Sequence, residues 1–200
     1  MEYLVAMMTH VPDGTSEKVV SEIRGREAAR SRQLAEQGHL LRLWRPPLKP
    51  GEWRTIGLFA AADHGDLEKV LASMPLRVWR ADKITPLSPH PNDPDGGRDL
   101  KETGAEFLTT FIQAVPQGTS NQAVEEAKAR EAVRARELAE RRHLVPLWAL
   151  PGQGRALGLW RAQDPAEMQA IVESLPLYAM MTTEITPLTQ HPSDPAITDS

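Results

Sequence analysis

The chain has 200 residues, of which 40% are hydrophobic, a formal net charge of −4 and no cysteine. The acidic balance argues against a nucleic-acid surface, and the lack of cysteine excludes disulfides, thiolate metal sites and cysteine nucleophiles. The apolar run at residues 3–8 is too short to span a bilayer and lacks the basic leader of a signal peptide. We therefore expect a cytoplasmic protein without membrane attachment, large enough for two modest cores.

The first ninety residues predict alternating strands and helices. Residues 4–11 form an apolar run typical of a buried strand. After the turn residues Pro12-Asp13-Gly14, a hydroxyl at Thr15 or Ser16 can cap a helix that runs to about Gln37. Strands are expected at 39–45 and 53–60.

A second helix and a last strand complete this half of the chain. Asp63 is the candidate N-cap, and apolar side chains at Leu67, Leu71 and Met74 predict the buried stripe of the helix. The final strand is expected at 78–87. The order is βαββαβ, which is the ferredoxin-like arrangement of an antiparallel sheet with both helices on one face.

The same pattern recurs about a hundred residues later. Residues 2–47 align with 106–151 without a gap, and nearly half of the aligned positions are identical. After a three-residue deletion the register resumes, so that Pro75-Leu76 meets Pro176-Leu177 and His90-Pro91 meets His191-Pro192. A repeat of this length is a whole small domain. The fold class is therefore α+β, with tandem ferredoxin-like domains.

Domain boundaries follow from the repeat. We expect the first domain at 1–91, a Pro-, Asp- and Gly-rich linker at 92–104, the second domain at 105–192 and a frayed tail at 193–200. Exposed sheet faces of such domains commonly pair, which predicts a dimeric α/β-barrel type of pairing. Covalent joining would favour that pairing within one chain, although pairing with a half of another chain stays open.

One carboxylate lies on the apolar side of the first helix. Val20 and Leu34 are fourteen residues apart and share a side of the helix, and Glu27 is seven residues from each. Glu131 repeats this position in the second copy. Burying a carboxylate without a partner is costly. Either desolvation raises its pKa and leaves a general acid or base, or an arginine nearby, Arg30 or Arg134, neutralises it.

The order of motifs resembles the muconolactone delta-isomerase family over nearly the whole of each repeat. The resemblance rests on a strand ending in Val-Pro, a helix carrying Arg-Glu-Ala and closing Leu-Ala-Glu, then Arg42-Leu43-Trp44-Arg45, Pro75-Leu76 and His90-Pro91. It implies small, cofactor-free, oligomeric proteins with a ferredoxin-like fold that shift a double bond in an unsaturated lactone. It also implies that Glu27, and by the repeat Glu131, transfer the proton.

Such a reaction needs donors or cations for the negative charge that develops on the substrate. In the first copy Arg42 or Arg45 are candidates, with His39 or His90 as further donors. In the second copy the two arginines become Pro146 and Ala149. If the two arginines hold the charge of the substrate, the second site is altered or inactive, and the first site is the better candidate.

Other candidate residues recur in both copies. His143 and His191 repeat His39 and His90, and all four are candidate substrate-binding residues. The alternative for His39 and His143 is a structural role. His90 and His191 are either exposed tail positions or residues that cover a neighbouring site. Trp44 and Trp148 either pack in a core or interface or stack on an unsaturated substrate. No HxxxH or HxH motif occurs, so we expect neither a metal site nor a cofactor.

Three functions fit these features. The first is an isomerase that acts on a small unsaturated lactone or related enolisable compound. The second is a cyclase, including the pericyclic type, that tailors a polyketide-like natural product in the same pocket. The third is a non-catalytic binding or assembly module. In each case we expect a homo-oligomer whose ligand is a small molecule, with no nucleic acid or membrane as partner.

Overall fold

The computed structural model describes residues 1–94, 100–101 and 104–198. The chain forms two compact units. Unit 1 consists of Met1–Leu87 and Thr189–Ser200, and unit 2 consists of Ser88–Leu188. Each unit therefore holds most of one repeat together with the terminal residues of the other. Of the predicted linker at 92–104, residues 95–99 and 102–103 lie outside the described residues.

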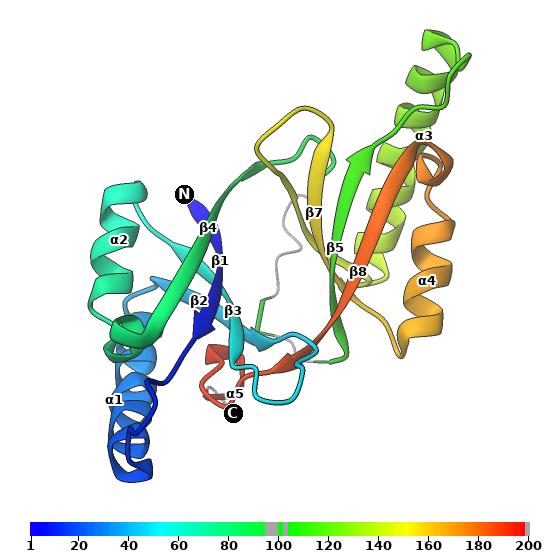
Figure 1. The fold of residues 1–200 in the computed structure, drawn as a ribbon. Helices are drawn as coiled ribbons and strands as arrows, with labels where there is room; N and C mark the ends of the chain where they lie inside the picture. The colour runs from blue at the N-terminus through cyan, green and yellow to red at the C-terminus, as the bar shows by residue number, and fades with distance from the viewer. Residues whose placement is uncertain (95–99, 102–103, 199–200) are drawn as a thin grey trace. The chain divides into compact units, whose positions relative to one another are not determined.

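Unit 1 contains one antiparallel sheet in the order β4-β1-β3-β2, the order of a ferredoxin-like domain. Helices α1 and α2 cover one face of this sheet (Figure 1). The elements are β1 (Glu2–Thr9), α1 (Glu17–Glu36), β2 (Leu40–Arg45), β3 (Arg54–Ala60), α2 (His64–Ala72) and β4 (Arg80–Pro89). The predicted βαββαβ order is confirmed.

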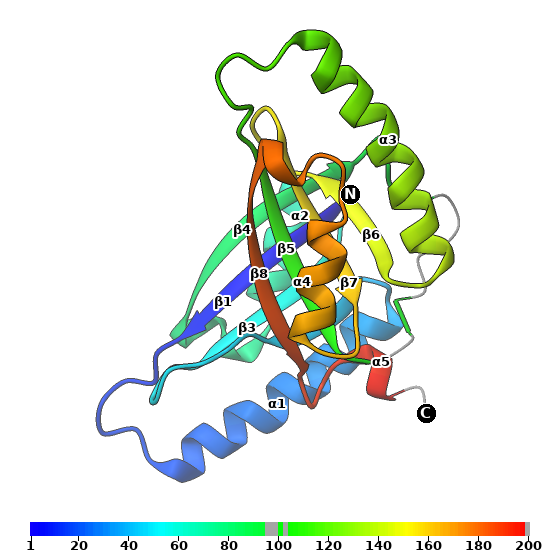
Figure 2. The same cartoon turned by 90° about the vertical axis from the view of Figure 1, so that its right-hand side faces the viewer.

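Unit 2 repeats the arrangement with the sheet order β8-β5-β7-β6. Helices α3 and α4 lie on one face of this sheet, as Figure 2 shows from the side. The elements are β5 (Glu106–Gln113), α3 (Asn121–Glu140), β6 (Leu144–Ala149), β7 (Arg155–Arg161), α4 (Pro165–Glu173) and β8 (Met181–Gln190).

Local chemistry explains where the helices begin. The side chains of Ser16 and Ser120 accept hydrogen bonds from backbone amides three residues on, at the starts of α1 and α3. Asp63 and Asp164 cap α2 and α4 in the same way. These caps satisfy amides that have no partner inside a helix. All four helix starts match the sequence prediction.

Each unit has its own hydrophobic core between sheet and helices. In unit 1, fully buried side chains come from the sheet and from both helices, such as Val5, Leu34 and Leu71. In unit 2, Leu138 and Met168 occupy comparable positions on α3 and α4. Burying one such side chain stabilises the fold by about 1.5–3 kcal/mol. This packing fixes the inward face of α1 and α3, which carries Glu27 and Glu131.

Two local predictions were wrong. The last strand of the first repeat begins at Arg80 and not at 78, because Pro75–Trp79 forms a 3-10 turn. The tail is not frayed at its start, because Asp194 is fully buried and its carboxylate lies 3.0 Å from the guanidinium of Arg42. A short helix, α5 (Pro195–Thr198), follows.

The ends of β4 and β8 extend the two sheets. Thr189 and Gln190 of β8 pair with Arg45 and Trp44 of β2 within unit 1. Ser88 and Pro89 of β4 pair in the same way with β6 within unit 2. The second repeat thus delivers His191 to unit 1, and the first repeat delivers His90 to unit 2. Among the described residues, none of the helices has the length and apolar character needed to cross a membrane.

Candidate active site

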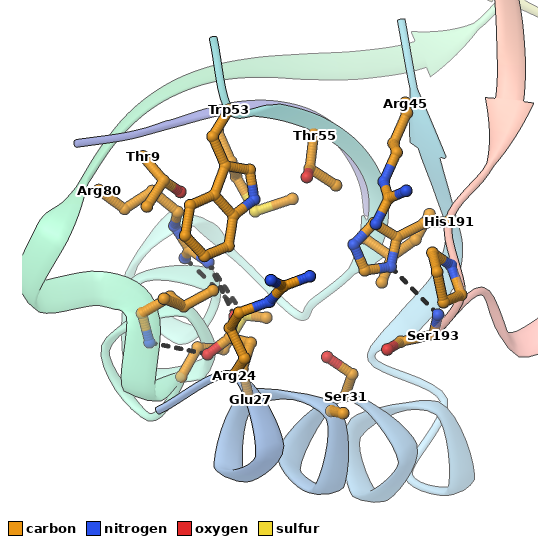
Figure 3. A pocket seen from close by; sticks show the side chains of 16 residues that line it. Thr9, Arg24, Glu27, Ser31, Arg45, Trp53, Thr55, Arg80, His191 and Ser193 are labelled. Carbon is orange, nitrogen blue, oxygen red and sulfur yellow. Dashed lines mark hydrogen bonds and ion pairs between the residues drawn. The ribbon is translucent and has the colours of Figure 1, made fainter. Parts of the chain in front are cut away.

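A cavity of about 200 Å³ opens in unit 1 between α1 and the sheet. Glu27 and Ser31 reach it from α1, Arg45 from the end of β2, and Arg80 from the start of β4 (Figure 3). His191 lines it from the terminal segment. We call this space the first cavity.

Glu27 is held at the wall of the first cavity by two contacts. Its Oε2 accepts a hydrogen bond of 2.8 Å from the amide of Leu76, and its Oε1 lies 3.2 Å from Nη1 of Arg80. Burial raises the pKa of Glu27, and nearby Asp82 adds to this, whereas the Leu76 amide and Arg80 lower it. The net pKa is raised, because desolvation is the largest effect.

Arg80 is shared between Glu27 and a second carboxylate, so its positive charge does not offset Glu27 only. Its Nε lies 2.6 Å from Oδ1 of Asp82, which is almost fully buried. The arginine that sequence reasoning proposed as partner, Arg30, instead bonds to Ser73 and Gln33. The proposed neutralisation by Arg30 is therefore wrong, and the partner of Glu27 is Arg80.

His191 enters the first cavity as a neutral ring. Its Nδ1 accepts a hydrogen bond of 3.1 Å from the amide of Ser193, so the ring proton resides on Nε2. Burial, followed by the charge of Arg45, lowers the pKa of His191 to about 4, although Asp194 acts in the opposite direction. At neutral pH the ring is a hydrogen-bond donor that carries no charge.

Guanidinium groups give the first cavity a cationic wall. Arg24 and Arg45 line it together with Arg80, and Glu27 is the only carboxylate among the described lining residues. The guanidinium of Arg24 stacks over the ring of Trp53 at 5.3 Å, and both side chains line the cavity (Figure 3).

Unit 2 contains a larger cavity of about 520 Å³ at the equivalent place, which we call the second cavity. The Oε2 atom of Glu131 accepts a hydrogen bond of 3.0 Å from the amide of Leu177, as Glu27 does from Leu76. Burial raises the pKa of Glu131, and the Leu177 amide lowers it less. Met181 occupies the position of Arg80, since it pairs with Gln113 as Arg80 pairs with the equivalent Thr9.

His90 lines the second cavity as His191 lines the first. Its Nδ1 accepts a hydrogen bond of 3.1 Å from the amide of Asn92, which again leaves the proton on Nε2. Burial lowers the pKa of His90, and the charge of Asp93 opposes this. Both cavities therefore pair one carboxyl group of raised pKa with one neutral histidine.

The structure brings together five of the residues that the sequence singled out. Glu27, Arg45 and His191 line the first cavity, and Glu131 and His90 line the second. The prediction that His90 serves the first copy was wrong. The reason is that β4 continues into unit 2, where Pro89 pairs with Trp148.

The other predicted residues line neither cavity. The Nδ1 atoms of His39 and His143 each lie 3.0 Å from a backbone carbonyl, of Ala60 and of Arg161. Arg42 is fully buried against Asp194, so it is not a group that meets substrate. Trp44 and Trp148 are buried as well.

Sequence reasoning missed Arg80, Arg24 and Trp53 in the first cavity. Arg80 is 53 positions from Glu27 and stands in a strand without any motif, so only the fold reveals it. Arg24 offered one signal, because it lies three residues before Glu27 and hence on the same side of α1. Within the described residues, no group of three or more His, Asp or Glu side chains is placed to hold a metal ion.

Known proteins resemble this chain repeat by repeat. The family model described as muconolactone delta-isomerase matches residues 1–93 and again 105–194. Muconolactone Delta-isomerase 1 of Acinetobacter lwoffii is 30% identical over 92 residues, which cover 46% of this chain and 93% of that protein. Muconolactone Delta-isomerase of Cupriavidus pinatubonensis is likewise 30% identical over 92 residues, covering 46% and 97%.

Solved structures of other proteins resemble this chain in fold only. A mutant chlorite dismutase from Candidatus Nitrospira defluvii has a TM-score of 0.59 at 11% identity, covering 98% of this chain and 94% of that one. A heme-binding protein from Thermus thermophilus has a TM-score of 0.56 at 11% identity, covering 95% and 92%. Because the family model matches both repeats, the chain belongs to the muconolactone delta-isomerase family and consists of two tandem copies of its domain.

Proposed function

We propose that this protein is a cofactor-independent isomerase that moves a proton, and with it a double bond, in a small unsaturated lactone or a related enolisable compound. Glu27 and Glu131 act as the acid/base groups of the two cavities. The observation that carries the proposal is the pairing, in each cavity, of a carboxyl group whose pKa burial raises with a neutral histidine.

The chemistry requires one group that takes a proton and returns it elsewhere. The carboxylate removes a proton from the carbon activated by the lactone carbonyl, and the electrons of that C–H bond pass into a dienolate. The carboxylic acid then protonates another carbon of the dienolate, which shifts the double bond. A raised pKa suits both steps, because the group must bind the proton and release it near neutral pH.

The dienolate needs stabilisation while the proton is held by the enzyme. The Nε2–H group of His191 or His90 donates to the developing oxyanion, as a neutral donor in a site shielded from water. In the first cavity Arg24 and Arg45 add positive charge. Muconolactone, which the relatives' names specify, carries a carboxylate, and this charge makes the first cavity its natural site.

The test is turnover of muconolactone by the wild type, Glu27→Gln, Glu131→Gln and the double variant. Glutamine keeps the shape and the hydrogen bond from the Leu76 amide but cannot take up a proton. We expect Glu27→Gln to lower kcat by about 10²–10⁴-fold, with an unchanged melting curve as the control for folding. Full turnover in the double variant would overturn the proposal.

A cyclase is the second candidate, and the size and apolar walls of the second cavity favour it. A cyclase that acts by confining its substrate tolerates Glu131→Gln but loses activity when Ala156→Phe fills the cavity. An isomerase loses turnover in both variants, so the response to Glu131→Gln is what separates the two functions. A non-catalytic module would turn over neither class of substrate, whichever variant is used.

The proposal also covers how the domains pair and how the chains assemble. Joining two copies in one chain raises the effective concentration of each for the other, which favours the dimeric α/β-barrel type of pairing within one chain. Separately, we expect the chain to form a homo-oligomer, as the family resemblance implies. Light scattering of the purified chain measures the oligomer, and a mass equal to a single chain would contradict this part of the proposal.

A further inference from the structure

We propose that the second cavity accepts a different class of substrate from the first: an uncharged, unsaturated carbonyl compound with a hydrocarbon substituent, bound with its carbonyl toward Glu131 and His90. This inference rests on the proposed function of these two residues. It would make the tandem protein an enzyme with two specificities, one for small anions and one for larger neutral molecules.

The two cavities differ in charge at equivalent positions. Arg45 and Arg80 of the first cavity are replaced by Ala149 and Met181 in the second. The change removes two of the guanidinium groups that line the first cavity, while the carboxylate itself stays as Glu131. A substrate anion placed beside Glu131 meets a like charge with neither of these two guanidinium groups to offset it, and the desolvation of that anion is costly.

The remaining cations of the second cavity lie at its exposed margin. Lys128 is exposed and pairs with Glu125 at 2.9 Å. Arg155 is exposed and donates to the carbonyl of Pro151 at 3.2 Å. Neither replaces Arg45 or Arg80 beside the acid/base group. Glu131 and His90 are therefore the titratable groups that face the interior of the cavity, among the described residues that line it.

The two cavities also differ in volume, and the side chains that line the second one are mainly apolar. A volume of about 520 Å³ lies within the usual range of about 300–1,000 Å³ for sites that bury a drug-sized ligand, and the first cavity of about 200 Å³ lies below it. The walls are built mainly from apolar side chains, including Phe111, Leu144, Leu147, Trp160, Leu175 and Met181.

The aromatic wall is fixed in place rather than adaptable. The indole of Trp160 donates from Nε1 to Oγ1 of Thr109 at 2.6 Å, which satisfies its polar atom away from the cavity. The ring of Phe111 meets it edge to face at 6.3 Å. The two rings therefore offer a rigid apolar surface to a hydrocarbon or an unsaturated chain. The second cavity thus has a polar end, formed by Glu131 and His90, and apolar walls. These features match a substrate with one carbonyl group and a hydrocarbon substituent.

The experiment compares two probes of equal length by isothermal titration calorimetry. One is γ-hexylbutenolide, and the other is the same butenolide with a carboxypentyl chain. Matched variants fill one cavity each: Ala156→Phe in the second and Thr55→Phe at the equivalent position in the first. We expect γ-hexylbutenolide to bind the wild type and Thr55→Phe equally, and to bind Ala156→Phe at least tenfold more weakly. The carboxylated probe should bind the second cavity at least tenfold more weakly than the neutral one.

Two further variants, which change the charge of one cavity each, test the inference even if Ala156→Phe does not fold. Ala149→Arg gives the second cavity the guanidinium of the first, and Arg45→Ala removes it from the first. Ala149→Arg should gain affinity for the carboxylated probe and lose it for the neutral one. The inference is overturned if both probes bind the second cavity equally, if Thr55→Phe rather than Ala156→Phe abolishes binding of the neutral probe, or if neither probe binds at all.

Failure of this inference is distinguishable from failure of the proposed function. Calorimetry measures which guest each cavity binds and does not require turnover. If Glu27→Gln and Glu131→Gln leave turnover intact, the acid/base role fails whatever the probes do. If those variants abolish turnover but the two cavities bind both probes alike, only the division of specificity fails.

Discussion

Arg80 donates a hydrogen bond of 3.2 Å to the carboxylate of Glu27. The second unit keeps the glutamate but replaces the arginine by Met181. Each of the two carboxyl groups thus accepts one hydrogen bond from a backbone amide, and within the part of the chain that the structure describes only Glu27 has a guanidinium beside it. This difference gives the chain its own internal control for the effect of a guanidinium on a buried carboxyl group, the proposed acid/base group of each cavity.

Replacing Arg80 by Met, as in the second repeat, should raise the pKa of Glu27 further. The guanidinium favours the charged carboxylate, so its removal favours the protonated form. In a Glu131→Gln background the pH profile of kcat/KM reports on Glu27 alone, and its acidic limb should move to higher pH in Arg80→Met. The matched change Met181→Arg, in a Glu27→Gln background, should move the limb of Glu131 to lower pH. A profile that does not move in either variant would contradict the role of Glu27 and Glu131 as bases.

Breaking the buried pair of Arg42 and Asp194 should destabilise unit 1. Both side chains are fully buried, and the carboxylate also accepts a hydrogen bond of 3.0 Å from the amide of Leu43. Asp194→Asn leaves a buried charge without its partner, which costs about 3–5 kcal/mol. Urea unfolding measures this loss. The double variant Arg42→Met with Asp194→Leu removes both charges and should recover much of the stability; equal losses in the two cases would argue against the ion pair as the cause.

Stability should fall as the pH falls through the range in which His191 titrates. Its pKa is about 4 in the folded protein and about 6.5 in an unfolded chain. Between these values the unfolded state binds the proton and the folded state does not. The contribution is therefore present above about pH 6.5 and lost toward pH 4, with a slope of at most about 1.4 kcal/mol per pH unit for one proton.

Urea titrations at several pH values test this slope against His191→Gln, which has no titrating ring. Glu27 and Glu131 act with the opposite sign, because a raised pKa gives stability that is present below pH 4.5 and lost as the pH rises through the folded value. Their effect is the same in both proteins and cancels in the difference. A wild type and a variant with parallel pH profiles would show that His191 is not shielded.

Local signals explain what could be predicted from the sequence. Hydroxyl and carboxyl caps mark the helix starts, and the seven-residue spacing around Glu27 places it on the inward face of α1. The repeat carries the same conclusion to Glu131. One of the two alternatives for the terminal histidines was that they cover a neighbouring site. The strands before them end on the sheet of the other repeat, so each histidine lines the cavity beside that sheet.

Long-range contacts explain what could not be predicted. Arg42 was expected to meet substrate, but Asp194, which is 152 positions away, holds it in the interior. Arg80 reaches Glu27 from a strand that carries no motif. The first site was expected to be the better one because Pro146 and Ala149 replace its arginines in the second copy. The structure adds that the second cavity is larger and that Met181 replaces the arginine beside its carboxyl group, two features that no motif indicates. Volumes and charge pairs depend on packing between distant segments, and no local pattern encodes them.

The central claim is that Glu27 and Glu131 carry the substrate proton, and hydrogen exchange measures it most directly. Muconolactone is incubated with enzyme in deuterated buffer, and the entry of deuterium at the exchangeable carbon is followed by NMR. We expect exchange with the wild type, and a rate at least about 100-fold lower for the double variant Glu27→Gln with Glu131→Gln, at an unchanged melting temperature. Exchange at the wild-type rate in the folded double variant would contradict the account.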